Sequence, residues 1–158
     1  MGALGTGKTY LGKRLSSAMH IPLYDLDDIQ WTRKFDKYRP LEQRKKLIHR
    51  ITRKTKWVVS GVPFPWTGIA IHRAQQIIIL QESFWLQTLR IILRGIKMSV
   101  NDAVSLGAIL GALRHNYTGF HKKNGYGAKT IERIKKEHQE KVTMISSKSE
   151  MRRFLEEE

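Results

Sequence analysis

The chain opens on a short glycine-rich segment that ends in lysine and threonine. Residues 2–9 read Gly-Ala-Leu-Gly-Thr-Gly-Lys-Thr and match the pattern G-x-x-x-x-G-K-T at every fixed position. Glycines let the backbone curl so that successive N–H groups point inward, where they can bind phosphate oxygens. Apolar residues with helical spacing follow at once, which predicts a helix over residues 9–19 whose N-terminus favours an anion. The segment therefore predicts a phosphate-binding loop joined to a helix.

Two side chains of this segment have the chemistry to act on a nucleotide. Lys8 supplies a positive charge for the β- and γ-phosphates, and Thr9 supplies a hydroxyl for Mg²⁺. We therefore expect ATP and Mg²⁺ as cofactors. The expected nucleotide-binding residues are Gly2, Gly5, Thr6, Gly7, Lys8, Thr9 and Tyr10. Two other interpretations are a glycine-rich tail and the N-myristoylation pattern M-G-x-x-x-[ST], but neither explains Lys8 and Thr9.

Helical and apolar segments alternate along the rest of the chain. Strands are expected within residues 21–26, 57–60, 76–80 and 142–145, and helices at 9–19, after Pro40, and at 84–94, 104–113, 130–139 and 149–157. Alternation of this kind predicts an α/β fold: a P-loop NTPase-type parallel sheet with helices on both faces. A length of 158 residues fits one domain, residues 1–158.

The position of the loop raises a question about the sheet. A phosphate-binding loop normally connects a buried strand to a helix, yet only Met1 precedes this one. That strand is central in a doubly wound sheet, and without it the strands at Trp57 and Ile77 would lack a shared partner. We expect that the first strand is missing from the chain, through a late start or a truncation. The alternative is a sheet that closes over the gap.

Composition excludes several classes of protein. The chain has no cysteine, which excludes disulfide scaffolds and thiolate metal sites and fits a reducing compartment. The apolar run at residues 77–80 is too short to span a membrane, and the run at 85–96 is interrupted by Arg90 and Arg94. The first ten residues do not resemble a secretory signal. We expect a cytoplasmic protein with no membrane span.

The order of several segments resembles the adenylate-kinase-like small P-loop kinases, and within them the topology modulation protein or adenylate kinase-related kinase group. The segments that carry the resemblance are residues 2–9, 21–28 with Trp31, 57–61, 73–80, Arg90-x-x-x-Arg94 and 142–155. It covers nearly the whole chain except residues 95–129. The resemblance implies ATP-dependent phosphoryl transfer to a small acceptor, a nucleotide or nucleoside.

The resemblance also implies roles for two acidic residues after the second strand of such kinases. Asp25 and Asp27 are the candidates to orient or deprotonate the acceptor, or to hold Mg²⁺ through water. Residues i and i+2 at the end of a strand project to the same side, so both carboxylates could face one ligand. The alternative is a solvated strand end in which Asp27 or Asp28 caps a helix.

The pair Arg90 and Arg94 lies four residues apart, so on the predicted helix the two share a face. The resemblance assigns them to the ATP phosphates and the base, and guanidinium groups suit the charge of a transferring phosphoryl group. The alternative is an ordinary helix surface with its arginines in solvent. The predicted catalytic residues are thus Lys8, Asp25, Asp27, Arg90 and Arg94, and the predicted metal ligands are Thr9 and Asp25.

Two positions depart from the pattern of the resembled kinases. Ser60 stands before Gly61 where relatives often carry Asp, and Gln81 stands where the next strand often ends in an acid. The chain could therefore be a weak kinase, or a nucleotide-dependent protein that binds nucleic acid without catalysis.

Positive charge is concentrated in one segment, residues 33–56. It holds eleven Lys and Arg and two acids, and so carries nine of the fifteen net positive charges of the chain. The resemblance places it on the acceptor side, where an anionic acceptor or nucleic acid would suit it, and Trp31, Phe35 and Tyr38 could stack a base. The alternative is a solvated face. Residues 95–129 are a candidate lid or, equally, a surface loop.

Overall fold

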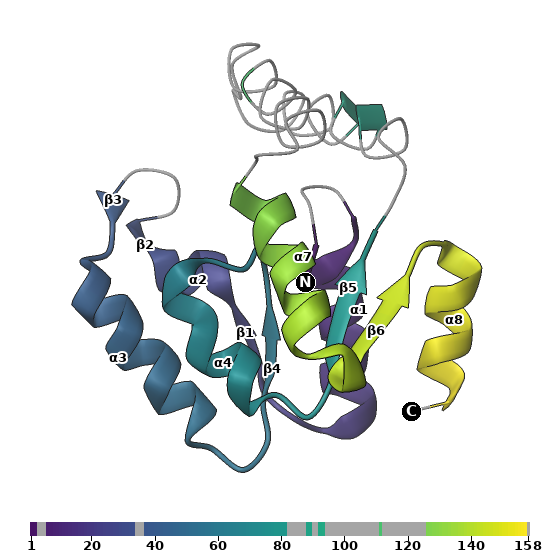
Figure 1. Cartoon of the computed structure of the whole chain (residues 1–158), viewed down its shortest axis with the longest axis horizontal. Coiled ribbons are helices and arrows are strands. Elements are labelled where there is room, and N and C mark those ends of the chain that lie inside the picture. The colour runs from purple at the N-terminus through teal and green to yellow at the C-terminus, as the bar shows by residue number, and fades with distance from the viewer. Residues whose placement is uncertain are drawn as a thin grey trace.

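The computed structural model describes residues 1–2, 6–33, 37–81, 88–89, 92–93, 111 and 126–157. In chain order the elements are α1 (Lys8–Met19), β1 (Leu23–Asp25), α2 (Leu26–Gln30), β2 (Trp31–Arg33), β3 (Lys37–Tyr38), α3 (Leu41–Thr52), β4 (Val58–Ser60), η1 (Pro65–Thr67), α4 (Gly68–Arg73), β5 (Ile77–Leu80), α7 (Tyr126–Glu137), η2 (Gln139–Lys141), β6 (Val142–Ile145) and α8 (Lys148–Glu157) (Figure 1). Helices and strands alternate, as expected for an α/β fold.

Four of the strands form two parallel pairs. β1 lies beside β4 with Asp25 opposite Ser60, and β5 lies beside β6 with Leu80 opposite Ile145. β2 and β3 form a separate antiparallel hairpin. The arrows of β4, β5 and β6 point toward one edge in Figure 1, so the carboxyl ends of these strands face the same side of the molecule.

The first two residues lie along β5. Gly2 forms a parallel bridge with Leu80, the Leu80 N–H donates to the Met1 carbonyl at 2.8 Å, and the Met1 amino group donates to the Ile78 carbonyl. A Cβ on Gly2 would stand 2.5 Å from the Leu80 carbonyl oxygen, so this approach requires glycine. Within the described residues β4 and β5 are not paired with each other, and the amino terminus lies between the two parallel pairs in Figure 1.

Alternate side chains of β5 enter two different cores. Ile77 and Ile79 pack in a cluster with Ile71 of α4 and Ile134 of α7. Leu80 packs in a cluster to which α1 and α8 contribute, and Ile78 lies against that cluster. Because successive strand residues point to opposite faces, helices cover both faces of the sheet here, as predicted.

A third core lies between the short helices. Leu26, Ile29, Ile48, Ile51, Trp66 and Ala70 form it, from α2, α3, η1 and α4. It positions α3 beside the β1–β4 pair, with one face of the helix buried and the other in solvent. Burial of this kind stabilises a short helix that propensity alone would not.

The structure corrects several sequence expectations. The hairpin β2–β3 and the helices α2 and α4 were not predicted, because such short elements show no periodicity of their own; α2 and α4 pack with α3 in the third core. α7 begins at Tyr126, within residues expected to be a loop. Of the helix expected at 84–94, Thr88, Leu89, Ile92 and Leu93 are described and helical. The helix expected at 104–113 lies outside the described residues except for Gly111.

No helix within the described ranges is long and apolar enough to cross a membrane.

Candidate functional site

Several residues of the predicted site lie at the carboxyl edge of the parallel strands. Asp25 is the last residue of β1 and Ser60 is the last residue of β4, directly opposite it in the register. Gly2, the first residue of the glycine-rich segment, is bridged to Leu80 at the end of β5. Ligands of open parallel sheets bind outside these strand ends, so the loop and Asp25 lie where a ligand is expected.

Gly7 shapes the start of α1. It is the N-cap residue, with φ 85° and ψ 15°, a left-handed conformation that L-residues other than glycine rarely adopt. The helix has no side-chain cap, and the Gly7 carbonyl accepts the first helical hydrogen bond from the Leu11 N–H at 3.0 Å. The first turn therefore presents backbone N–H groups at the positive end of a twelve-residue helix, which suits a phosphate group.

The remaining predicted loop residues differ in exposure. Thr6 is buried, Lys8 is half-buried, and Thr9 and Tyr10 are exposed to solvent. Gly5 lies outside the described residues. An exposed hydroxyl at Thr9, in the first turn of α1, is accessible to a metal ion that arrives with a nucleotide.

Lys8 stands close to the amino terminus. Burial, and secondarily the positive charge of Lys8, lower the pKa of the Met1 amino group from 8.0 to about 5. At neutral pH the amine is therefore uncharged in the folded protein, and Lys8 is the cationic side chain of this corner beside β5. An anion bound there would be attracted by Lys8.

Asp25 is a helix cap. Its Oδ1 accepts a hydrogen bond from the Asp27 backbone N–H at 2.9 Å, at the N-terminus of α2. The alternative that Asp27 or Asp28 is the cap is wrong, because both lie inside the first turn of α2. The strand geometry expected for Asp25 and Asp27 is also wrong, since β1 ends at Asp25. Within the described part of the chain, the second carboxylate oxygen of Asp25 has no hydrogen-bond partner.

In the sequence, Ser60 stands out only as a departure from the pattern of the resembled kinases. It is 5% exposed, and its hydroxyl has no hydrogen-bond partner among the described residues. Gly12 of α1 packs directly against it, and a Cβ on Gly12 would stand 3.3 Å from the Ser60 Cβ. A small polar residue between Val59 and Gly61, at the end of an apolar run, is the signal that could have identified a buried hydroxyl.

Other predicted site residues are not brought into this arrangement. Arg90 and Arg94 lie outside the described residues, as does most of the candidate lid at 95–129. Gln81 is exposed, and its backbone N–H donates to the Ile145 carbonyl at 2.9 Å. Trp31 and Tyr38 stack on each other with ring centroids 4.0 Å apart, and Phe35 lies outside the described residues.

The oxygen donors of Thr9 and Asp25 fit Mg²⁺ only if a bound nucleotide supplies further ligands. The described residues contain no group of three His, Asp or Glu side chains that could hold a metal ion. Mg²⁺ is usually held by one or two carboxylates together with substrate phosphates and water. The exposed Thr9 hydroxyl and the second oxygen of Asp25 match that incomplete set.

Comparison with known proteins places this arrangement in a fold class. The chain resembles a crystal structure of shikimate kinase from Bacteroides thetaiotaomicron, with a TM-score of 0.52 and 16% sequence identity over 99% of this chain and 92% of that one. At this identity the likeness is one of fold. The chain therefore has a small P-loop kinase-like fold, with a mixed α/β arrangement and parallel strands.

Two further comparisons gave weaker similarity. YqaC of Bacillus subtilis (strain 168), an uncharacterized protein, is 36% identical over 67 residues, which is 42% of this chain and 38% of that protein. A structure of an uncharacterized protein from Eubacterium ventriosum has a TM-score of 0.45 at 12% identity, over 92% of this chain and 86% of that one. No protein-family model matches the chain. Membership of the adenylate kinase-related group stays a prediction.

Proposed function

We propose that the protein transfers the γ-phosphoryl group of ATP to a small acceptor, a nucleotide or nucleoside. One observation carries the proposal: a left-handed Gly7 begins α1 and is followed by Lys8 and Thr9, at the carboxyl edge of parallel strands. A backbone turn of this kind at a helix N-terminus is a site for phosphate. The P-loop kinase-like fold supports the same class of reaction.

In the proposed reaction the acceptor oxygen forms a bond to the γ-phosphorus while the bond to the β–γ bridging oxygen breaks and ADP leaves. The α1 N–H groups and Lys8 would stabilise the phosphate charge. The second oxygen of Asp25 would orient the acceptor hydroxyl and take up its proton. Asp27 lies in the first turn of α2 beside it. Bound Mg²⁺, held by Thr9 and by Asp25 through water, would add positive charge at the phosphates.

Arg90 and Arg94 remain part of the proposal. On the predicted helix they would contact the ATP phosphates and flank the base, and residues 95–129 would close over the bound substrates. Support for these roles comes from the resemblance to small P-loop kinases and from the helical state of Thr88, Leu89, Ile92 and Leu93.

Phosphorus NMR with ATP, Mg²⁺ and a panel of nucleotides and nucleosides tests the proposed transfer. Lys8→Ala should reduce transfer at least 100-fold, because one preorganised donor at a developing charge contributes about that much. Lys13→Ala is the matched control, since Lys13 is an exposed lysine of the same helix. ATP binding without transfer to any acceptor would refute the proposed enzyme.

Asp25→Asn separates the two roles of Asp25. Asn caps helices about as well as Asp, so the free energy of unfolding should change by less than about 0.5 kcal/mol. Transfer should fall about 100-fold if the carboxylate takes up the acceptor proton. Normal transfer by the folded variant would limit Asp25 to its capping role.

A second candidate function is a nucleotide-dependent protein that binds nucleic acid without catalysis. The specific observation in its favour is Ser60, a neutral residue opposite Asp25 where relatives of the resembled group often carry an acid. Lys8→Ala distinguishes the two candidates. It should abolish transfer by a kinase, but should leave oligonucleotide affinity nearly unchanged in the non-catalytic protein.

A further inference from the structure

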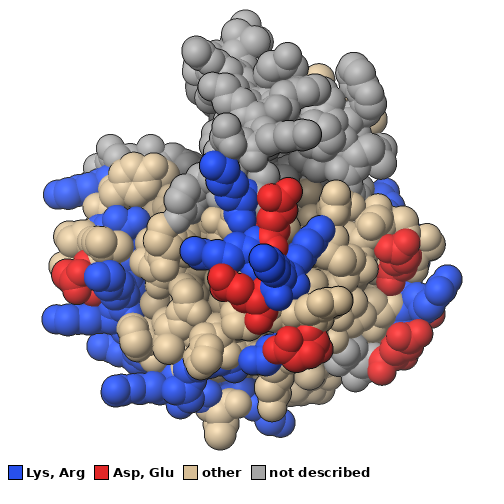
Figure 2. All heavy atoms as spheres, in the orientation of Figure 1, with Lys and Arg blue, Asp and Glu red and all other residues tan. Residues whose placement is uncertain are grey.

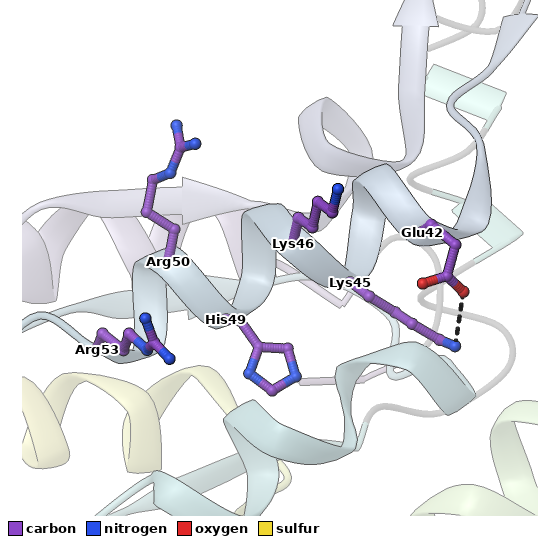
Figure 3. Close-up of a pocket in the computed structure, with 6 residues that line it drawn as sticks. All are labelled: Glu42, Lys45, Lys46, His49, Arg50 and Arg53. Carbon is purple, nitrogen blue, oxygen red and sulfur yellow. Dashed lines mark hydrogen bonds and ion pairs between the residues drawn. The ribbon is translucent and has the colours of Figure 1, made fainter.

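α3 has one buried face and one strongly basic face. Ile48, Ile51 and Thr52 are buried in the core. The opposite face lines an open hollow of about 520 Å³ and consists of Glu42, Lys45, Lys46, His49, Arg50 and Arg53 (Figure 3). These six residues, here called the basic stripe, are all exposed and recur at intervals of three and four, so they follow one side of the helix.

The structure divides the basic residues of this segment into two kinds. Some stabilise the fold: the Arg39 guanidinium donates to backbone carbonyls, Arg44 lies over the Tyr38 and Trp66 rings, and Lys54 donates to the Tyr24 hydroxyl at 2.6 Å. The basic side chains of the stripe make no such bonds to backbone carbonyls or contacts with aromatic rings among the described residues. The sequence alone could not separate the two kinds.

Most of the charge on the stripe is unpaired. Lys45 is bonded to Glu42 at 2.9 Å, as the dashed line in Figure 3 marks. Within the described part of the chain, the side chains of Lys46, Arg50 and Arg53 have no ion pair or hydrogen bond. Lys46 and Arg50 lie four residues apart, and Arg50 and Arg53 three apart, so their like charges repel and destabilise the helix.

Two other exposed helices, α7 and α8, mix charges of both signs, whereas α1 carries three basic residues and no acid. α8 carries Lys148, Arg152 and Arg153 together with three glutamates, and α7 pairs Arg133 with Glu137 at 4.0 Å. In Figure 2 lysine and arginine side chains gather over the side of the molecule where α3 lies, with little red among them. A solvated face gains from charges of mixed sign, so the stripe differs from an ordinary surface.

We propose that the basic stripe of α3 binds the phosphate backbone of single-stranded nucleic acid. From Glu42 to Arg53 the helix rises about 16 Å, long enough for several successive phosphates. The Tyr38 ring, 58% exposed, lies just before the N-terminus of α3; one face stacks on Trp31 and Arg44 lies over the ring, so it offers a base the part of the ring that remains exposed. Neither feature uses the glycine-rich loop, so the proposal does not depend on phosphoryl transfer.

Fluorescence anisotropy with a labelled 20-nucleotide single strand, at several salt concentrations, tests the proposal. The stripe variant combines Lys46→Gln, Arg50→Gln and Arg53→Gln. The control variant combines Lys148→Gln, Arg152→Gln and Arg153→Gln, which removes the same charge from three exposed positions of α8. Circular dichroism and thermal unfolding verify that both variants fold.

The stripe variant should bind at least 10-fold more weakly, and the control should stay within about 3-fold of the unmodified protein. The slope of log K against log salt should become shallower by about 2, since three single-strand phosphate contacts contribute about 0.7 each. Lys46→Arg with Arg50→Lys and Arg53→Lys should retain binding, because it retains the charge. Tyr38→Ala should weaken single-strand binding more than duplex binding.

Three results would overturn the proposal. Equal losses in the stripe and control variants would show that net charge alone acts. Absence of binding at 50 mM salt would exclude a nucleic-acid site. Stripe-dependent binding to anionic lipid vesicles with no binding to the oligonucleotide would identify a membrane-surface site instead. Lys8→Ala should leave oligonucleotide affinity within 2-fold, so failure of the proposed kinase activity is distinguishable from failure here.

Discussion

Gly7 shows how one residue prepares the candidate site. Its φ of 85° turns the chain into α1, and among the described residues only the Met151 Cε lies near the position of a Cβ, at 3.7 Å. Space is therefore not what selects glycine here; the backbone conformation is. In the proposed function, the same conformation directs the first N–H groups of the helix toward a phosphate.

Gly7→Ala should lower the free energy of unfolding by about 1–2 kcal/mol and abolish ATP binding, because an L-residue is strained in the left-handed region. Gly68→Ala is the matched control. Gly68 has φ −51° at the start of α4, and no atom of the described residues lies within 4 Å of a Cβ there, so alanine should stabilise the protein by about 0.4–1 kcal/mol. Urea denaturation and ATP calorimetry measure both effects, and an unaffected Gly7→Ala protein would contradict the argument.

Ser60 presents the opposite case, a polar group without a partner. A buried hydroxyl that lacks a hydrogen bond costs stability, so Ser60→Ala should raise the free energy of unfolding by about 1 kcal/mol. Thermal unfolding measures the change, and Val59→Ala, a half-buried neighbour, should be destabilising. If Ser60→Ala instead weakens the binding of ATP with Mg²⁺, the hydroxyl belongs to the ligand site.

At the scale of elements, Arg39 connects α2 to the β2–β3 hairpin. Its Nε donates to the Ile29 carbonyl at 3.1 Å and its Nη2 to the Trp31 carbonyl at 3.2 Å. Its own backbone N–H donates to the Gln30 carbonyl at 2.8 Å. A hairpin whose two strands have three and two residues needs such bonds, because two short strands are marginal alone.

Arg39→Met should lower the free energy of unfolding by about 2 kcal/mol, since it keeps the length of the side chain but removes the donors to half-buried carbonyls. Arg53→Met, an exposed arginine without such bonds, should change it by less than about 0.5 kcal/mol. Chemical denaturation compares the two. Equal effects would show that Arg39 contributes only its charge.

The elements that sequence patterns predicted correctly are those with a strong apolar repeat. β6 has the expected bounds, and α1, β4, β5 and α8 differ from expectation by one residue at one end. β5 was the clearest, because four consecutive branched aliphatic residues suit a strand buried on both faces. α2, α4 and the hairpin have too few residues for a period to show; packing against α3 decides the two helices, and the hairpin depends on the bonds of Arg39.

At the scale of the whole molecule, the buried amino terminus makes stability depend on pH. The pKa of the Met1 amino group is about 5 in the folded protein against its ordinary value of 8.0. Between these values the unfolded chain holds a proton that the folded chain does not, so the free energy of unfolding rises with pH from 5 to 8. Three pKa units correspond to about 4 kcal/mol, nearly all of it present above pH 8 and lost by pH 5.

Urea denaturation at pH 5, 6.5 and 8 should therefore show a steeper rise for the protein with a free amine than for its N-acetylated form, which cannot titrate there. The acetylated amide can still donate to the Ile78 carbonyl, so the strand contact is retained. Other titrating groups contribute equally to both forms and cancel in the comparison. Parallel pH profiles would contradict burial of the amine.

The sequence by itself determined the glycine-rich loop, the helix after it, the parallel α/β class and the concentration of positive charge in residues 33–56. Each of these depends on neighbours along the chain or on the repeat of apolar residues. Tertiary structure alone decided that Asp25 caps α2, that the Ser60 hydroxyl is buried without a partner, and which basic side chains of α3 remain unpaired. Caps, burial and ion pairs depend on which distant element packs against a residue, and a linear pattern does not contain that information.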